Sequence, residues 1–137
     1  MKFAVIDTDV VSFAFRGDDR YSFYRPVVES TVPMISFMTY AEMRHGALNR
    51  NWGERRTNEL LTFIENHFAI IQSDKSMADA WAMLRDAATR AGRVLRTADG
   101  WVAAAAVSRD IPLVSNNEKD FGYLPNLTLI TDPAKRP

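Results

Sequence analysis

Three acidic residues lie at positions where this chain could assemble a metal site. Asp7 directly follows the short apolar run 3–6, and Glu42 and Asp99 lie near the starts of predicted helices. In a parallel α/β domain, strand ends and the neighbouring helix starts gather at one edge of the sheet. Carboxylates that meet there can bind a divalent cation, which supports phosphodiester hydrolysis. We therefore predict that these three acids converge on one cation.

The residues around Asp7 and Glu42 also fit structural roles. Asp7 can close a turn while Asp9 caps the next helix, and for Asp9 we favour this capping role. For Asp7 we favour function, because a carboxylate at the tip of a central strand lies where open α/β sheets bind ligands. Thr39 and Glu42 have the spacing of a capping box, which by itself favours a capping role for Glu42.

Asp99 has a different context, because a wholly apolar segment follows it. Thr97 is a typical helix cap, and the helix dipole favours an acid in the first turn by under about 1 kcal/mol. The segment 101–107 is apolar on every side and rich in Ala, so its helix is expected to be buried close to the sheet. A buried carboxylate needs a partner, and a cation is suitable.

A second oxygen-rich segment follows the predicted strand 111–114. Ser115 and Glu118 have capping-box spacing, which is the structural alternative for this segment. Asn117 and Asp120 offer further oxygen ligands, and the residues alone do not decide between them.

Composition limits the possible chemistry. The 137 residues suit one domain, 1–137, and the 17 basic and 17 acidic residues cancel, so any contact with nucleic acid must be local. The absence of cysteine excludes thiolate metal sites and Cys nucleophiles, and two histidines are too few for a His-rich site. Metal binding would therefore use oxygen ligands.

No segment has the pattern of a membrane span or a signal peptide. The first apolar run ends at Asp7 after four residues, and the longest uncharged run, 30–41, is shorter than the roughly 20 residues that cross a bilayer. We predict a cytoplasmic protein with no membrane segment.

Short apolar runs alternate with helical patterns along the chain. Runs of this kind suit strands covered on both faces, and they occupy residues 3–6, 32–37, 68–71, 111–114 and 127–130. Helical spacing recurs over 60–68 and 77–91. This alternation predicts an α/β/α domain of three layers with a mostly parallel central sheet of about five strands. The aromatic-rich stretch 9–29, around a polar loop at 17–20, has no clear assignment.

The chain as a whole resembles a PIN-domain ribonuclease of the VapC toxin type, the toxic half of a type II toxin–antitoxin pair. The resemblance follows four segments in order: Phe3–Asp9, Ile35–Glu42 with Gly46, Asp99–Ala105, and Leu113–Phe121. It implies that Asp7, Glu42 and Asp99 form the acidic cluster and that Asn117 or Asp120 supplies the remaining oxygen. Asp9 stands where such proteins often have Asn.

The resemblance implies an endoribonuclease that uses Mg²⁺, with Mn²⁺ as a possible substitute, and leaves 5′-phosphate and 3′-hydroxyl ends. Mg²⁺ keeps several waters and prefers few protein carboxylates. We therefore expect Asp7 and Asp99 as direct ligands, while Glu42 either binds the ion or orients the attacking water. We also predict Asp120 as a catalytic acid.

The implied partners are RNA, an antitoxin protein and a second copy of the chain. Arg93 and Arg96 closely precede Asp99 and are predicted to hold RNA phosphates. The aromatic residues between Phe13 and Tyr24 suit either antitoxin docking or the core of the domain itself.

Three other functions fit parts of the sequence. Asp7-Thr8-Asp9 matches the opening motif of haloacid-dehalogenase-like phosphatases, in which Asp7 would be the nucleophile, although the later Lys and Gly-Asp of that family are not apparent. A receiver domain would need an acid at the end of the third strand, and Asp74 comes late. A PIN-like module that only binds RNA or protein is the third alternative, and the intact acidic set argues against it.

Overall fold

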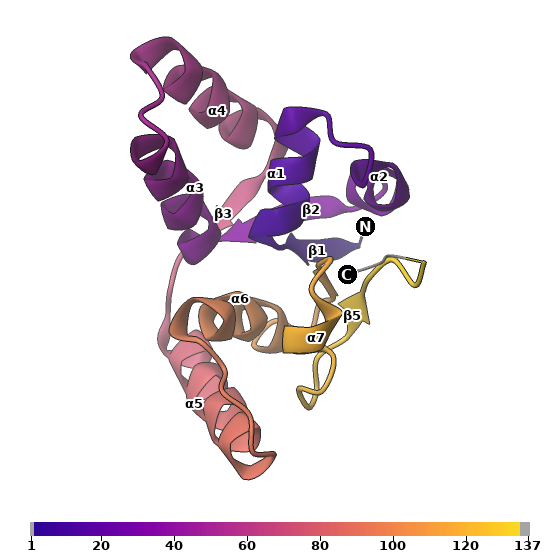
Figure 1. Ribbon diagram of the computed structural model, residues 1–137. Coiled ribbons are helices and arrows are strands. Elements are labelled where there is room, and N and C mark those ends of the chain that lie inside the picture. The colour runs from indigo at the N-terminus through magenta and orange to yellow at the C-terminus, as the bar shows by residue number, and fades with distance from the viewer. Residues whose placement is uncertain (1, 135–137) are drawn as a thin grey trace.

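The computed structural model describes residues 2–134 (Figure 1). In chain order the elements are β1 (Phe3–Ile6), α1 (Thr8–Arg16), α2 (Tyr21–Glu29), β2 (Val32–Ser36), α3 (Phe37–Asn49), α4 (Glu54–His67), β3 (Ala69–Ile71), α5 (Lys75–Arg90), α6 (Thr97–Val107), β4 (Leu113–Val114), α7 (Glu118–Phe121) and β5 (Leu129–Ile130).

The strands form one sheet in the order β3-β2-β1-β4-β5, and every pairing is parallel. Val5 of β1 lies in register with Met34 of β2 on one side and with Leu113 of β4 on the other. The chain runs outward from β1 in both directions, so β1 and β4 enclose the point where the strand order reverses. Ligands of open α/β sheets bind at the carboxyl ends of strands at such a point.

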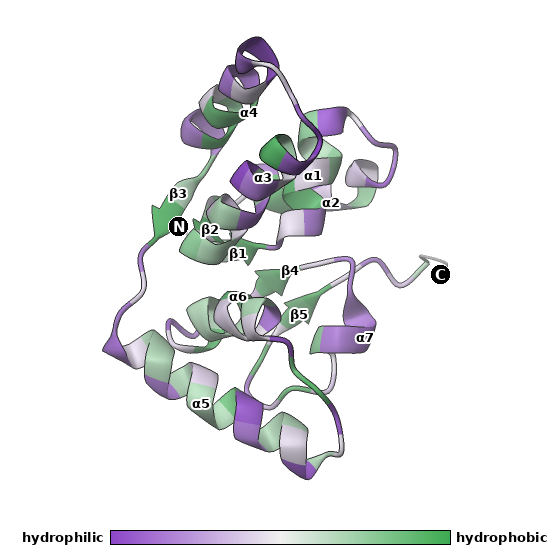
Figure 2. Ribbon diagram, turned by 60° about the vertical axis from the view of Figure 1, so that its left-hand side comes forward, coloured by the Kyte–Doolittle hydropathy of each residue, from purple (hydrophilic) through white to green (hydrophobic). Residues whose placement is uncertain are grey.

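Helices cover both faces of the sheet and enclose two hydrophobic cores. Alternate residues of β1 point to opposite faces, as the pleat requires: Val5 packs with α5 and α6, whereas Ala4 and Ile6 pack with α1, α2 and α4. Figure 1 shows α1–α4 on one side of the sheet and α5 and α6 on the other. Figure 2 shows hydrophobic residues concentrated in the strands between these layers. The expected three-layer fold is confirmed.

Helix α6 is buried on nearly every side, as its composition predicts. Residues 102–106 are at most 1% exposed. Its first turn comes so close to α5 that a Cβ at Gly100 would lie 2.6 Å from Nε1 of Trp81. Glycine at this position therefore permits the close approach of α6 to α5.

The unassigned stretch 9–29 forms two helices, α1 and α2. Gly17 ends α1 with φ 66°, a left-handed conformation that suits glycine. Of the aromatic residues here, Phe13 and Tyr24 are buried in the core, while Phe23 is 40% exposed. The core interpretation therefore holds for Phe13 and Tyr24. Within residues 2–134, no helix has the length and apolar character that crossing a bilayer requires.

Candidate active site

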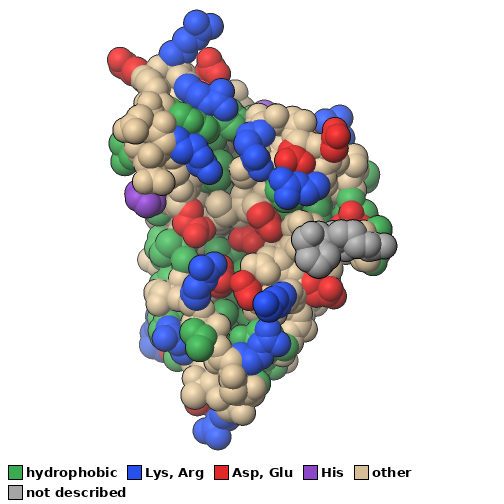
Figure 3. All heavy atoms as spheres, viewed as in Figure 1, with side chains coloured by type: hydrophobic (Ala, Val, Ile, Leu, Met, Phe, Trp, Pro, Cys, Tyr) green, Lys and Arg blue, Asp and Glu red, His purple; other side chains and the backbone are tan. Residues whose placement is uncertain are grey.

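The predicted acids Asp7, Glu42 and Asp99 line one cavity at the carboxyl end of β1, where the strand order reverses. A cavity of about 780 Å³ opens there, and its wall includes Asp7, Asp9, Glu42, Asp99 and Asn117. We call the first four of these residues the acidic cluster. Figure 3 shows acidic side chains gathered in the middle of this face, with Lys and Arg side chains above and below them.

Asp7 is the most buried member, with 7% of its surface exposed. It caps α1, because its Oδ1 accepts a hydrogen bond of 2.8 Å from the Thr8 backbone N–H. Its Oδ2 accepts 2.7 Å from the Ser115 hydroxyl at the end of β4. Burial raises the pKa of Asp7 well above its usual value, and the charges of Asp9 and Asp99 add to this effect. The side chain is therefore fixed in position and lacks a nearby positive charge of its own.

Asp9 lies in the first turn of α1. The prediction that Asp9 caps this helix is wrong, since Asp7 occupies the cap position. Its carboxylate accepts hydrogen bonds from the backbone N–H groups of Val10 (2.7 Å) and Asn116 (3.0 Å). Burial raises the pKa of Asp9, and these hydrogen bonds oppose the rise. Asp9 thus ties α1 to the segment after β4 and adds a carboxylate to the cavity.

Glu42 has no capping role, because α3 begins at Phe37 with Ser36 as its cap. Its Oε1 accepts a 2.6 Å hydrogen bond from the Thr8 hydroxyl, whose oxygen lies 3.0 Å from that of Thr39. A hydroxyl carries one hydrogen, so the arrangement fits a relay in which Thr39 donates to Thr8 and Thr8 to Glu42. The relay holds the exposed carboxylate at the cavity.

Asp99 enters the cavity from the first turn of α6, as predicted, although Arg96 and not Thr97 occupies the cap position. Burial raises its pKa, and Arg96 opposes the rise through a contact of 3.4 Å between Nε and Oδ2. The Arg96 side chain is 75% exposed, and its contact with Asp99 places its guanidinium at the edge of the acidic cluster.

The second oxygen-rich segment supplies a linked pair. Asn117 caps the short helix α7, so the expected box of Ser115 and Glu118 does not form. The Asn117 amide donates 2.8 Å to Oδ2 of Asp120, and its Oδ1 accepts 3.3 Å from the Asp120 backbone N–H. Asn117 lines the cavity, and Asp120 is near enough for its charge to raise the pKa of Asp99. An amide oxygen has two acceptor positions, so Asn117 retains one for a cation.

Arg93, which was predicted to bind phosphate, makes contacts within the protein. Arg93 donates 2.6 Å to the Lys119 carbonyl and lies 4.0 Å above the ring of Tyr123, so it fastens the segment around α7. Arg16 and Arg20, which were not predicted as site residues, line the cavity instead. Arg16 ends α1 and Arg20 follows the turn after it, so their positions depend on tertiary structure that residue spacing does not reveal.

The donor set suits a hard divalent cation. Within residues 2–134, no three acidic or histidine side chains converge tightly enough to form a complete ligand set. Mg²⁺ does not require one, because it keeps several waters and binds through one or two carboxylates. The carboxylates of Asp7 and Asp99 repel one another across the cavity, and a cation between them would relieve that repulsion. The oxygen ligands present therefore fit Mg²⁺ or Mn²⁺.

Known proteins resemble this chain in sequence and in fold. Ribonuclease VapC5 from Mycobacterium tuberculosis is 31% identical over 125 residues, which are 88% of this chain and 86% of the relative. Ribonuclease VapC2 from Rickettsia felis is 24% identical over 127 residues, or 91% of this chain and 94% of the relative. A crystal structure of VapBC2 from Rickettsia felis, bound to a DNA fragment of its promoter, contains a chain with a TM-score of 0.82. That match has 21% identity and covers 95% of this chain and 98% of the other.

The match to a family profile extends over nearly the whole chain. The profile described as the PIN domain covers residues 4–126, from β1 to the segment before β5. This span contains every member of the acidic cluster. The predicted resemblance to VapC proteins is thus confirmed, and this chain belongs to the PIN domain family.

Proposed function

We propose that this protein is a metal-dependent endoribonuclease of the VapC type. The acidic cluster carries the proposal: Asp7 at the end of β1 and three acids on α1, α3 and α6 line one cavity where a PIN-domain sheet reverses its strand order. Two relatives that match most of the chain are named as ribonucleases, which supports RNA as the substrate. Burial raises the pKa values of Asp7, Asp9 and Asp99, so gathering these three carboxylates at one cavity disfavours their charged forms, and a bound cation would offset this.

Asp7 and Asp99 would hold the cation, and Asn117 or Asp120 would complete the site. A bound Mg²⁺ or Mn²⁺ neutralises phosphate charge and lowers the pKa of a coordinated water. Asp7 cannot swing away, because Thr8 and Ser115 hold both of its oxygens.

Glu42 is suited to orient the attacking water and accept its proton. Its Oε1 is held by Thr8, which leaves Oε2 for the water. Water attack on the phosphorus with departure of the 3′ oxygen would leave 5′-phosphate and 3′-hydroxyl ends.

The test is cleavage of RNA by the purified protein with millimolar Mg²⁺ or with EDTA. We expect cleavage with Mg²⁺ and none with EDTA, and Asp99→Asn should abolish it. Asp86→Asn is a matched control, because Asp86 is an exposed acid on α5 that contacts Arg90. RNA that stays intact with the wild-type protein and Mg²⁺, or is cleaved equally in EDTA, would refute the proposal.

The phosphatase alternative is separable in the same preparation. It requires a phosphoryl group on Asp7 and no role for Glu42. The relay that holds Glu42 at the cavity favours the nuclease. Release of phosphate from a small phosphomonoester, with an acyl-phosphate trapped on Asp7, would favour the phosphatase.

We also propose that an antitoxin protein inhibits this chain and that two copies of the chain associate. The structural relatives include a toxin–antitoxin complex from Klebsiella pneumoniae, which matches with 25% identity and a TM-score of 0.69. Co-expression with the product of an adjacent small gene should restore growth of cells that the protein inhibits. Light scattering of the purified protein would report its oligomeric state.

A further inference from the structure

Two arginines lie together on the rim of the acidic cavity. Arg16 is the last residue of α1, and Arg20 directly precedes α2. The chain turns sharply between them at Gly17, and the turn is closed by a 2.9 Å hydrogen bond from the Asp18 N–H to the Phe13 carbonyl. Both arginines line the cavity that contains the acidic cluster. We call them the arginine pair.

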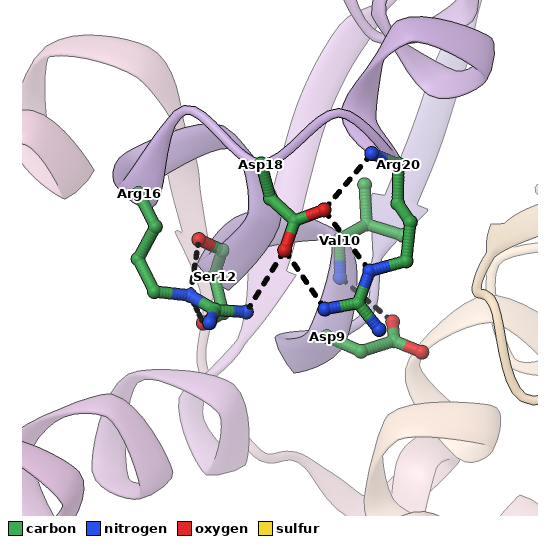
Figure 4. Close-up of polar contacts among 6 residues, drawn as sticks. All are labelled: Asp9, Val10, Ser12, Arg16, Asp18 and Arg20. Carbon is green, nitrogen blue, oxygen red and sulfur yellow. Dashed lines mark hydrogen bonds and ion pairs between the residues drawn. The ribbon is translucent and has the colours of Figure 1, made fainter.

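Asp18 lies between the two guanidinium groups (Figure 4). Arg20 binds it in a two-point contact, with Nε 3.0 Å from Oδ1 and Nη2 2.8 Å from Oδ2. Arg16 approaches the same Oδ2 to 3.7 Å through its own Nη2. The hydrogen bonds from Arg20 lower the pKa of Asp18 well below its usual value, so the acid is charged at neutral pH. A single carboxylate thus sets the orientation of both arginines.

Contacts with Phe13 and Ser12 also hold the arginine pair in place. The Arg20 guanidinium carbon lies 4.2 Å from the centre of the Phe13 ring, and Phe13 is buried. Arg16 Nε donates 3.2 Å to the Ser12 hydroxyl within α1. These contacts limit the side-chain freedom that would otherwise be lost on binding a ligand.

Each guanidinium still has donors for a ligand. Arginine has five N–H groups. Arg20 uses two of them on Asp18, which leaves three, and Arg16 retains the N–H groups of Nη1. The side chains are 46% exposed at Arg16 and 58% exposed at Arg20, so these donors are accessible from the cavity side.

We propose that the arginine pair binds a backbone phosphate of the RNA strand beside the phosphate that is cleaved, and that Asp18 positions both arginines for it. This inference rests on the proposed function. RNA must place its phosphates next to the carboxylates of the acidic cluster, which repel them. The chain has no net charge to offset that repulsion, so local cations at the rim are required. Planar guanidinium groups match the geometry of phosphate oxygens.

Two measurements on each variant test the inference, namely RNA affinity in EDTA by fluorescence anisotropy and cleavage in Mg²⁺. We expect Arg16→Gln and Arg20→Gln each to weaken binding of a short single-stranded RNA about tenfold. Together they should reduce the salt dependence of log affinity by about 0.7, the value for one phosphate on a single strand. Arg90→Gln is the matched control, because it breaks a similar exposed contact, 2.8 Å to Asp86, on α5.

Two further variants separate positioning from charge. Arg20→Lys keeps the charge but loses the two-point contact, so affinity should fall about threefold while the salt dependence stays. Asp18→Asn adds one unit of positive charge, which by itself would tighten RNA binding. If Asp18 positions the arginine pair, binding should weaken instead, and tighter binding would overturn its positioning role.

The outcomes distinguish this inference from the proposed function. A wild-type protein that cleaves RNA, with arginine variants of unchanged affinity and salt dependence, would overturn the inference alone. The same result is expected if the arginine pair instead contacts an acidic segment of a protein partner. A wild-type protein that neither binds nor cleaves RNA would overturn both proposals.

Discussion

Replacing Asp7 with asparagine should stop RNA cleavage and at the same time stabilise the fold. The substitution keeps the size of the side chain and its Oδ1 acceptor for the Thr8 N–H. The new amide can donate to the Ser115 oxygen, which also accepts a 3.0 Å hydrogen bond from the Asn117 N–H. What the substitution removes is a buried negative charge beside Asp9 and Asp99.

The sign of the stability change follows from the pKa of Asp7. Burial and like charges raise it above the value of about 3.9 in an unfolded chain. The folded protein therefore binds this proton more tightly, so Asp7 lowers stability progressively as the pH rises from about 4 through the raised pKa. Removing the charge should recover on the order of 1–3 kcal/mol near neutral pH. For 137 residues, each 1 kcal/mol changes Tm by about 3–5 °C.

Thermal unfolding in EDTA, followed by circular dichroism at neutral pH and below about pH 4, measures this change. The wild type and Asp7→Asn should differ at neutral pH and converge in acid. Asp86→Asn serves again as the control and should leave the unfolding temperature unchanged at both pH values. A variant that unfolds at a lower temperature than the wild type at neutral pH would show that the charge of Asp7 is stabilised in the fold, contrary to this reasoning.

Three further predictions concern the cation, the general base and the packing of α6. Mg²⁺ at about ten times its Kd should stabilise the wild type by about 1.4 kcal/mol in a thermal-shift assay at neutral pH; an equal shift in Asp7→Asn would place the ion elsewhere. Glu42→Gln should reduce the single-turnover cleavage rate about 10²- to 10⁴-fold without weakening RNA binding, and an unchanged rate would exclude a proton-accepting role. Gly100→Ala should cost about 1–3 kcal/mol in urea unfolding, because its Cβ would lie 2.6 Å from the Trp81 indole. Gly53→Ala, which meets no atom within 4 Å, is the comparison.

The strands were the most predictable part of the fold. The run 3–6 matches β1, and 32–37 exceeds β2 by one residue, because strands covered on both faces are apolar throughout. The runs 111–114 and 127–130 contain β4 and β5, but only their last two residues form strand. Apolar residues beyond the paired segment, such as Ile111 and Leu127, pack against the core without joining the sheet.

Helix starts were less predictable, because the end of the preceding strand decides them. Ser36 ends β2 and caps α3, so Thr39 falls inside the helix and is buried there. The supposed partner of Thr39 in a capping box, Glu42, is thereby free to face the cavity. A capping-box spacing is a local pattern, whereas the start of α3 is set by the register of a strand in the sheet. The capping explanation for Glu42 therefore fails, and the case for Glu42 as a site residue is stronger than the sequence alone indicates.

The arginines near the site were also hard to predict, because their positions depend on tertiary packing. Proximity to Asp99 in the sequence predicts Arg93 and Arg96 as phosphate-binding residues, yet the Lys119 carbonyl holds Arg93. Arg16 and Arg20 line the cavity because α1 starts at the end of β1 and the chain turns at Gly17. Proximity in sequence does not report that packing.

Two groups of negative charge need neutralising in the proposed complex: the carboxylates inside the cavity and the RNA phosphates at its rim. The inner carboxylates of Asp7 and Asp99 have raised pKa values, and the contact of Asp99 with Arg96 only partly offsets the effect of burial. A cation is suited to this inner position, because it contacts carboxylates directly. In the proposed complex, a neighbouring RNA phosphate would lie farther out and would need its own donors at the rim. The two requirements are therefore separable: loss of the cation should abolish cleavage, whereas loss of Arg16 and Arg20 should weaken RNA binding and leave the cation site intact.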